Sequence, residues 1–549
     1  MGKNGSKESR LRFLILVGII FSASVIRFSY YGATYFYQLD DYIQYYGFPN
    51  YESTWAAIKS INLLANRPLA GLMDAYVWSS LFDNMWVAVV ILAGLMTASA
   101  FIFRSILQRH FKVYPFFLIV FCLLPLGFEG TYWVSASARV VCALFFTALS
   151  GFMLQLYAEK GRIYQLILYL FFQLLCFGFY EQAVPLSLTL TAIIIFLNRK
   201  ALKRRCLFGL LSLPNVLLYF GICGLLSGDT GYSSRAEFIL PTSSYYFNVF
   251  LPSLMGQLKA AFLSSGFYIT VKGALRGLNI IVSDTAVLYG LATLALCVGI
   301  AVFIILSDKK VRGEKQKISS SLMYLLTGIL LTAAPVSLFF ITTNTWFSVR
   351  GTVMSFLGIA MIADWLLVSI SGLFKRHGLK VYAACSSVAM LVFMVASISE
   401  LHDYKLTYEN DQNTLAAIAS VVDESMENVA VLNVNPSSLA EQNYPYHEHI
   451  HGVTDSYWAL SGALNAYIEA PSYEYATLVA PIRSDGAISN PFDDFEQFTD
   501  FFFIDDNLNI FRVYMEESDD SLSFFKENGE KLGYIRETDG EHYLILTSG

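Results

Sequence analysis

The sequence predicts an all-α polytopic membrane domain followed by a small α/β domain. Of the 549 residues, 55% are hydrophobic and only 15% are charged, a composition typical of chains with many membrane spans. Apolar runs long enough to cross a bilayer recur from the N-terminus to residue 398, whereas helix and strand patterns alternate after residue 400. We therefore divide the chain into a membrane domain, 1–399, and an α/β domain, 400–549.

About eleven apolar runs are candidate transmembrane helices. They cover residues 11–31, 85–107, 114–131, 139–157, 163–180, 183–198, 206–227, 285–307, 318–341, 351–373 and 380–398. Basic residues precede the first run and no small-residue cleavage site follows it, so we expect a signal anchor rather than a cleaved signal peptide.

Basic residues indicate the orientation of these helices, because they cluster at every second connection, starting with the N-terminus. The clusters are 3–12, 104–112, 160–162, 199–205, 309–317 and 375–380. Basic residues favour the cytoplasmic ends of membrane helices. The N-terminus is therefore expected inside the cell, and an odd number of spans makes the α/β domain extracytoplasmic.

Two long loops are predicted on the outer side of the membrane, 32–84 and 228–284. In the first, apolar residues at helical spacing alternate with charged ones, which favours a helix lying in the membrane interface. In the second, 246–271 is only moderately apolar and is interpreted as an interfacial or re-entrant helix. If 246–271 spanned the membrane, all later basic clusters would lie outside the cell, so we do not expect a span there.

The α/β domain is predicted from its own patterns. We expect a helix at 411–427 and a buried strand at 430–435, followed by strands at 475–482, 501–506, 508–515 and 541–547.

Several classes of function lack support in this sequence. There is no Walker loop, no Gly-x-Gly-x-x-Gly after a strand and no Gly-x-Ser-x-Gly. The net charge of −6 lies largely in the last third of the chain, so no nucleic-acid partner is expected. All seven cysteines lie in apolar segments, which argues against a disulfide framework. No cofactor is assigned with certainty, and a divalent metal stays possible.

Asp40 and Asp41 form an acidic pair directly after the first apolar run. A carboxylate beside an acceptor hydroxyl can remove its proton during group transfer, with or without a metal. The alternative is a solvated turn, where Asp is common. Because adjacent residues of an extended loop point to different sides, only one of the two is expected to meet an acceptor.

Polar residues also mark the next outer turns. Glu129 and Arg139 bracket one turn, and Glu181 and Gln182 lie between two apolar runs. Charged groups at such positions usually face a cavity or a partner. They are candidates for substrate binding, and a structural Glu–Arg pair is the alternative reading.

Some arginines lie on the predicted outer side and are exceptions to the positive-inside pattern. One or two of them would suit a lipid phosphate, because a guanidinium binds phosphate through two hydrogen bonds. Arg350 is the first choice, since it lies beside aromatic residues, and Arg67 is a further candidate. The alternative is that these side chains reach toward lipid headgroups. The outer arginines are Arg27, Arg67, Arg139, Arg235, Arg276 and Arg350.

Three histidines alternate at His447, His449 and His451, and on a strand they would share one face. Three imidazoles can bind Zn²⁺, which makes them weak metal candidates. A surface cluster or a sugar-stacking patch with Tyr457 and Trp458 is the alternative.

The chain resembles the GT-C superfamily of polytopic glycosyltransferases. The resemblance depends on the acidic segment 38–41 after the first apolar run, on Glu129 and on the segment 180–182. Within the superfamily the chain is most similar to bacterial Gtr-type glucosyltransferases. The segment 445–466 resembles the outer domain of proteins of that type. The resemblance implies inverting transfer of a sugar, a hexose such as glucose, from a polyprenyl-phosphate donor to a cell-surface glycan or glycolipid acceptor outside the cell membrane. It also implies that Asp40 or Asp41 is the catalytic base. No WWD-type motif is present, so a protein-asparagine acceptor is not expected.

Two other classes of function stay open from the sequence. A transporter or flippase of a lipid-linked sugar would typically show inverted repeats, and no repeat is evident. A non-catalytic polysaccharide-assembly protein would bind glycan through its outer domain. Release of polyprenyl phosphate from a labelled donor distinguishes transfer from both.

Overall fold

We describe the fold from a computed structural model. The residues it describes are 3–50, 53–56, 67–198, 211–226, 239–307, 318–343, 346–423, 425–436, 450–470, 478–484, 486, 488, 495–518, 521–538 and 540–547. The chain divides into two compact units, which we treat separately. Unit 1 comprises Met1–Thr34, Lys59–Met73 and Asn84–Leu401; unit 2 comprises Tyr35–Ile58, Asp74–Asp83 and His402–Gly549.

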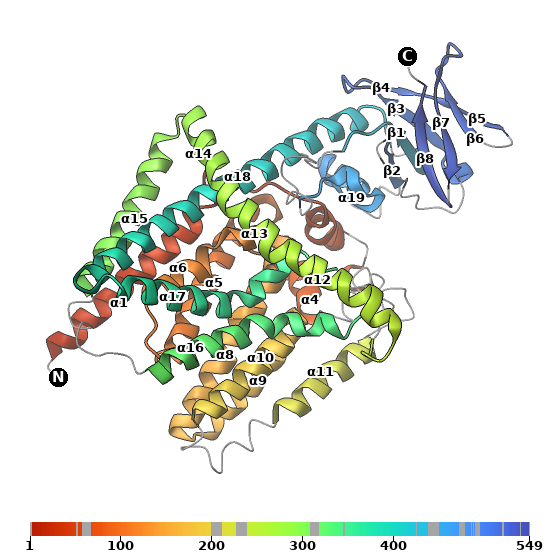
Figure 1. Cartoon of the computed structure of the whole chain (residues 1–549). Coiled ribbons are helices and arrows are strands. Elements are labelled where there is room, and N and C mark those ends of the chain that lie inside the picture. The colour runs from red at the N-terminus through yellow and green to blue at the C-terminus, as the bar shows by residue number, and fades with distance from the viewer. Residues whose placement is uncertain are drawn as a thin grey trace. The chain divides into compact units, whose positions relative to one another are not determined.

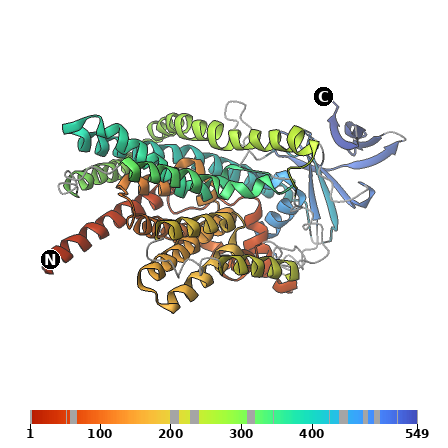
Figure 2. The same cartoon turned by 60° about the horizontal axis from the view of Figure 1, so that its bottom comes forward.

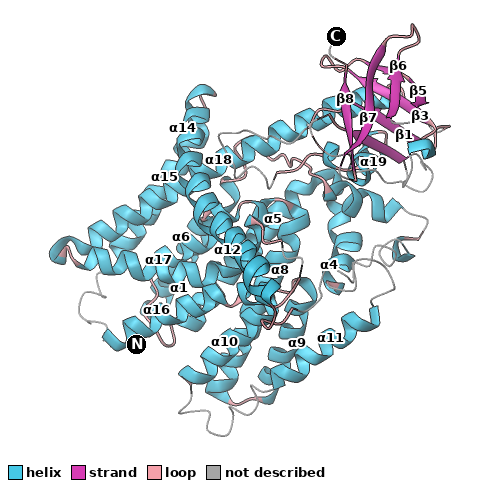
Figure 3. Cartoon of the chain, turned by 45° about the vertical axis from the view of Figure 1, so that its right-hand side comes forward, coloured by secondary structure: helices cyan, strands magenta, loops and turns pink. Residues whose placement is uncertain are grey.

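Unit 1 is helical wherever the described residues have regular structure, and Figure 3 shows strands only in unit 2. Its helices are α1 (Lys3–Ile26), α4 (Pro68–Met73), α5 (Met85–Leu107), α6 (Pro115–Leu123), α7 (Glu129–Tyr132), α8 (Val134–Lys160), α9 (Ile163–Phe179), α10 (Ala183–Leu197), α11 (Ser212–Leu226), α12 (Leu251–Lys259), α13 (Ser265–Phe267), α14 (Gly273–Ser283), α15 (Val287–Ser307), α16 (Ile318–Ala333), α17 (Phe356–Gly372) and α18 (Gly378–Ala419), the last of which continues into unit 2.

Five helical segments of the described chain are long and apolar enough to cross a membrane: Pro68–Leu107, Val134–Lys160, Val287–Ser307, Val349–Gly372 and Lys375–Ala419. Shorter apolar helices cover Pro115–Gly127, Ile163–Phe179, Ala183–Leu197, Ser212–Leu225 and Ser319–Ala333. The protein is therefore a mostly helical membrane protein, as the composition predicts. Every predicted apolar run overlaps a helix, and the number of spans and their orientation stay predictions.

The predicted span 114–131 is broken in the structure. Helix α6 ends at Leu123, a short 3₁₀ turn covers Pro125–Gly127, and α7 begins at Glu129. Proline lacks the N–H that continues a helical hydrogen-bond ladder, so Pro125 ends α6 at this point. The break places Glu129 at the start of a new helix.

Close packing joins α8 to α5, α9 and α10 (Figure 1). Buried hydrogen bonds reinforce it: the Tyr169 hydroxyl of α9 bonds to Thr191 of α10 and to Ser212 at the start of α11, and the Gln173 amide donates to Ser187 at 3.1 Å. Hydrogen bonds of this kind hold helices together where apolar surface alone gives little drive for association.

The predicted outer loop 228–284 contains one long helical run, from Tyr246 to Ser283, in which α-helical and π-helical turns alternate. Figures 1 and 2 both show it as a continuous yellow-green ribbon, and at 1.5 Å per residue it is roughly 57 Å long. It extends beyond the predicted helix 246–271. One face is buried, and Gly277 approaches Val395 so closely that a Cβ would lie 2.1 Å from the Val395 carbonyl oxygen. The interfacial placement stays a prediction.

The described residues of unit 2 form two four-stranded sheets. In the first, of order β2-β1-β3-β4, β1 (Asn428–Leu432) is parallel to β2 (Leu478–Ile482) and β3 (Asp500–Ile504), and β4 (Ile510–Arg512) is antiparallel to β3. The second is an antiparallel meander of β5 (Tyr514–Ser518), β6 (Ser521–Phe525), β7 (Lys531–Thr538) and β8 (Glu541–Leu546). The central strands β1 and β3 are almost wholly buried, as expected of parallel strands covered on both faces.

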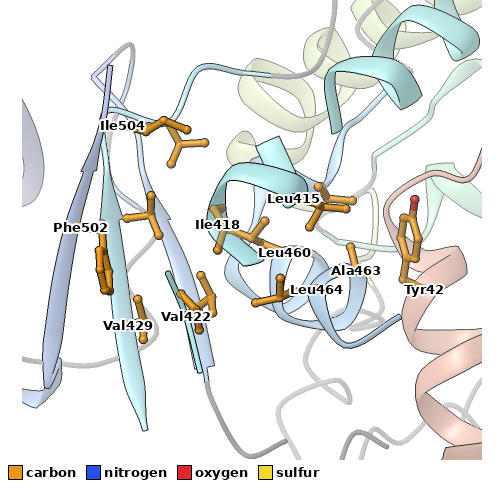
Figure 4. Close-up of a cluster of buried hydrophobic side chains, with 14 residues drawn as sticks. Tyr42, Leu415, Ile418, Val422, Val429, Leu460, Ala463, Leu464, Phe502 and Ile504 are labelled. Atoms are coloured by element: carbon orange, nitrogen blue, oxygen red, sulfur yellow. The ribbon is translucent and has the colours of Figure 1, made fainter. Parts of the chain in front are cut away.

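Helices cover one face of the first sheet. Figure 4 shows Leu415 and Ile418, near the end of α18, beside Leu460 and Leu464 of α19 (Tyr457–Tyr467), with Val429 of β1 in the same buried cluster. The other face of the sheet contributes to a second buried cluster, which includes Ala430, Leu432, Phe524, Ile535 and Leu544.

Candidate functional site

The acidic pair belongs to unit 2, where its two carboxylates have different surroundings. Asp41 is completely buried and accepts hydrogen bonds from the Tyr35 hydroxyl at 2.7 Å and from the Gln38 backbone N–H at 2.9 Å. Leu39 has a φ of +28°, and helical turns follow the pair, so the predicted extended loop is wrong at this point. Asp41 therefore orients the loop.

Asp40 is only half-buried, so solvent reaches it while Asp41 is enclosed. A general base must contact the hydroxyl from which it removes a proton. Of the two predicted catalytic residues, Asp40 is the one whose accessibility suits that role.

Aromatic residues around the pair pack mainly against one another. The ring of Tyr37 lies 5.7 Å from Tyr42, 5.0 Å from Phe82 and 6.2 Å from Tyr408. Burial raises the pKa of Tyr42 well above its ordinary value, and the charge of Asp411 adds to the shift. These aromatic rings therefore pack against one another and stabilise the loop that carries the acidic pair, rather than forming an open sugar-stacking surface.

The second group of predicted site residues comes together in unit 1 around Tyr180, at the turn between α9 and α10. The guanidinium carbon of Arg67 lies 4.5 Å from the centre of the Tyr180 ring. Arg67 also donates two hydrogen bonds to Glu181, with N–O distances of 2.7 and 2.6 Å. The charges of Arg67, Glu181, Arg350 and Glu129 all act on the Tyr180 hydroxyl, which places the four groups in one neighbourhood.

Arg350 lies in the 3₁₀ turn Val349–Ser355 that precedes α17. Its guanidinium carbon is 5.7 Å from the centre of the Trp133 ring and 5.5 Å from that of Trp346. The nearest Glu129 oxygen is 3.8 Å away; Glu129 is buried, whereas the Arg350 side chain is 30% exposed. An arginine near two aromatic rings is held in place by cation–π attraction and still keeps N–H donors for a ligand.

Glycines allow the segments that carry Glu129 and Arg350 to approach closely. A Cβ on Gly130 would lie 2.9 Å from the Val353 side chain and 3.1 Å from the Arg350 carbonyl oxygen. A Cβ on Gly351 would lie 3.4 Å from Nε2 of Gln182. Gln182 is fully buried, and its position beside Gly351 places it in the same cluster as Arg350.

Arg139 completes this group. It is half-buried near the start of α8, and its charge contributes to lowering the pKa of Glu181. Burial alone would raise that pKa, but the charge and hydrogen bonds of Arg67 outweigh burial and hold it below its ordinary value. The predicted residues Arg67, Glu129, Arg139, Glu181, Gln182 and Arg350 thus gather within unit 1.

Trp133 is a member of the cluster that the sequence reasoning missed. A signal for it exists, because Trp133 lies in the turn that Glu129 and Arg139 bracket.

The histidine candidates are only partly described. His447 and His449 lie outside the described residues. The Nδ1 atom of His451 is 2.9 Å from a carboxylate oxygen of Asp455, which also binds Arg483 at 2.8 Å. Within the described part of the chain, no group of three or more His, Cys, Asp or Glu side chains is arranged to hold a metal ion.

No family model matches the sequence, and no curated protein matches it. Among solved structures, the crystal structure of ArnT from Cupriavidus metallidurans bound to undecaprenyl phosphate aligns with 86% of this chain and 86% of its own, at 11% sequence identity and a TM-score of 0.33. A similarity at that TM-score supports no conclusion about this chain, so its function has to be argued from its own residues.

Proposed function

We propose that the protein is a GT-C-type membrane glycosyltransferase. It transfers a sugar, a hexose such as glucose, from a polyprenyl-phosphate donor to a cell-surface glycan or glycolipid acceptor on the outer face of the membrane, with inversion. The observation that carries this proposal is Arg350, a partly exposed guanidinium within 6 Å of the centres of two tryptophan rings, in a unit built of apolar helices. Such a group suits a phosphate attached to a lipid.

The charge of the cluster suits a phosphodiester. Arg67, Arg139 and Arg350 supply three positive charges, and Glu129 and Glu181 supply two negative ones, which leaves one net positive charge when all are ionised. A polyprenyl-phosphate sugar carries one negative charge, so donor and site are complementary.

Arg350 is better placed than Arg67 to bind the phosphate. One edge of the Arg67 guanidinium, formed by Nε and Nη2, is occupied by Glu181 at 2.7 and 2.6 Å. Arg350 approaches Glu129 only to 3.8 Å, longer than a hydrogen bond. We therefore assign Arg67 a positioning role and Arg350 the phosphate contact.

Asp40 is proposed as the general base. In an inverting transfer, the acceptor oxygen attacks the anomeric carbon on the face opposite the phosphate, Asp40 takes the acceptor proton, and the polyprenyl phosphate leaves with both electrons of the broken C–O bond. Arg350 stabilises the charge that collects on that phosphate. Asp41 holds the loop that carries Asp40.

The arrangement of helix ends supports an outer location. Trp133 precedes α8 and Lys160 ends it, about 40 Å away. Arg162 precedes α9 and Tyr180 follows it. Cluster residues and basic residues thus lie at opposite ends of the same helices, as the positive-inside rule requires if the cluster faces outward.

The test uses the purified full-length protein in lipid vesicles with radiolabelled polyprenyl-phosphate hexose and an acceptor glycan. Transfer releases unlabelled polyprenyl phosphate and labels the acceptor. Movement of the donor across the bilayer without release would instead identify a flippase, and retention of glycan without either event would identify a non-catalytic assembly protein. Asp40→Asn serves as the inactive variant and the exposed Glu537→Gln of β7 as its matched control.

A further inference from the structure

Buried hydrogen-bonding groups without partners gather around Arg350. Among the described residues, neither Nε2 nor Oε1 of Gln182 has a hydrogen-bond partner. The same holds, within that part of the chain, for Oε2 of Glu129 and for Nε1 of Trp133. All three side chains are at most 5% exposed. Buried polar groups are nearly always hydrogen-bonded, so such a cluster needs an explanation.

These groups surround one place in unit 1. Gln182 lies against Gly351, the residue after Arg350, with 3.4 Å between Nε2 and a Cβ built there. Glu129 is 3.8 Å from the Arg350 guanidinium, and the Trp133 ring lies 5.7 Å from its central carbon. The unpartnered groups therefore adjoin the proposed phosphate contact.

Helix capping does not explain Gln182. It occupies the position before the first residue of α10, where a side chain often accepts a hydrogen bond from a free backbone N–H, and it makes no such bond. Its Nε2 atom lies near Gly351, 3.4 Å from a Cβ built there.

The chemistry of these groups excludes a bare phosphate as their complete ligand. Oε1 of Gln182 and Oε2 of Glu129 are acceptors and require a ligand with O–H or N–H donors. An ionised phosphodiester has none. Neighbouring hydroxyl groups of a sugar both donate and accept, so they can satisfy these two acceptors together with the donors on Gln182 and Trp133.

We propose that Gln182, Glu129 and Trp133 bind the hydroxyl groups of the sugar that is attached to the donor phosphate. This subsite rests on the proposed function. It adds that these residues recognise the sugar part of the donor. A site built to hydrogen-bond a hydroxyl discriminates strongly against a ligand that lacks it, because its buried groups are then left unpaired. The three residues therefore determine which donor sugar is accepted.

The experiment measures how the full-length protein in detergent binds polyprenyl-phosphate hexose and, separately, polyprenyl phosphate without sugar. We expect the wild type to bind the sugar-bearing lipid more tightly. Gln182→Met should weaken that binding about 10–100-fold and leave the affinity for the sugarless lipid within about twofold. Without ligand, the same variant should melt on the order of 1–4 °C higher, because an unpaired buried amide has been removed.

Gln173→Met is the matched control. Gln173 is also fully buried, but its amide donates to Ser187 at 3.1 Å and accepts from Asn215 at 3.2 Å. This substitution should lower the melting temperature and leave the preference for the sugar-bearing lipid unchanged. Trp133→Phe is the second variant: it keeps a ring beside Arg350, removes one donor, and should weaken only the sugar-bearing lipid, by about 3–10-fold.

Two results would overturn the subsite and leave the phosphate contact standing. One is equal affinity of the wild type for both lipids. The other is a Gln182→Met protein that melts lower and loses both lipids to the same degree, as a structural role would require. Failure of the wild type to bind either lipid would instead overturn the proposed function, and the subsite with it.

Discussion

Arg67 and Glu181 form a two-point ion pair that joins the chain before α4 to the turn between α9 and α10. The two side chains are 27% and 33% exposed, so solvent screens part of their attraction. We expect Arg67→Ala to lower the free energy of unfolding by about 0.5–1.5 kcal/mol. A double-mutant cycle with Glu181→Ala, measured by thermal denaturation in detergent, checks this; a coupling energy near zero would show that the pair does not hold the turn.

The contribution of Glu181 to stability should depend on pH. Its pKa is held below the ordinary value of 4.5, so the pair stabilises the folded protein above about pH 4.5 and loses that contribution as the pH falls through the lowered pKa. The melting-temperature difference between wild type and Glu181→Gln should therefore be constant from about pH 6 to 8 and shrink below about pH 4.5. A difference that grows on acidification would contradict the assignment.

Arg350→Ala should weaken donor binding by about 1.5–3 kcal/mol, the contribution of a charged hydrogen bond. Arg350→Lys should restore only part of it, because lysine cannot form the two-point contact. Affinity for the polyprenyl-phosphate sugar in detergent is the measurement, and the exposed Arg376→Ala is the control for loss of one positive charge. Unchanged affinity in Arg350→Ala would move the phosphate contact to another arginine.

The two aspartates should differ in what they control. Asp40→Asn is expected to lower the transfer rate by about 10²–10⁴-fold with little change in melting temperature. Asp41→Asn should lower stability by about 1–2 kcal/mol, because Asp41 accepts two buried hydrogen bonds. Turnover and melting curves of both variants separate the roles. Near-normal turnover in both would direct the search to Glu129 and Glu181.

Orientation in the membrane is tested by fusions. A reporter placed after Gly549 should be active outside the cell, and one placed after Arg205 should be active inside. Reversal at Gly549 alone would indicate a miscounted span, with 246–271 the first segment to re-examine.

Apolar run length was sufficient to locate those helices of unit 1 that overlap the eleven runs, because their sequences are apolar over most of their length. It did not locate α4 or α12 to α14, which lie in the two predicted outer loops. It could not show that Pro125 divides 114–131, since a short proline break inside an apolar run still resembles a span. In unit 2 the strands Ser521–Phe525 and Lys531–Thr538 were not predicted. Both carry serine or charged side chains, which obscure the strand pattern.

The sequence predicted these candidate residues as a set but could not predict their geometry. The positive-inside rule predicts that Glu129, Glu181 and Arg350 lie on one side of the membrane. Nothing in the sequence could show that Arg67 pairs with Glu181 or that Arg350 approaches Glu129 to 3.8 Å, because these contacts join segments more than a hundred residues apart. Gln182 was predicted to face a cavity or a partner, but its complete burial could not be predicted from its place between two apolar runs.

Gly130 has no functional side chain, yet we expect its conservation to be linked to that of the Glu129–Arg350 pair. A Cβ there would lie 2.9 Å from the Val353 side chain and 3.1 Å from the Arg350 carbonyl oxygen, so the absence of a side chain lets the segments that carry Glu129 and Arg350 approach this closely. In distant relatives, we expect loss of this glycine to coincide with replacement of the arginine or with a smaller residue in place of Val353. The charged pair and the glycine would thus be inherited as one unit, although they lie more than two hundred residues apart in the sequence.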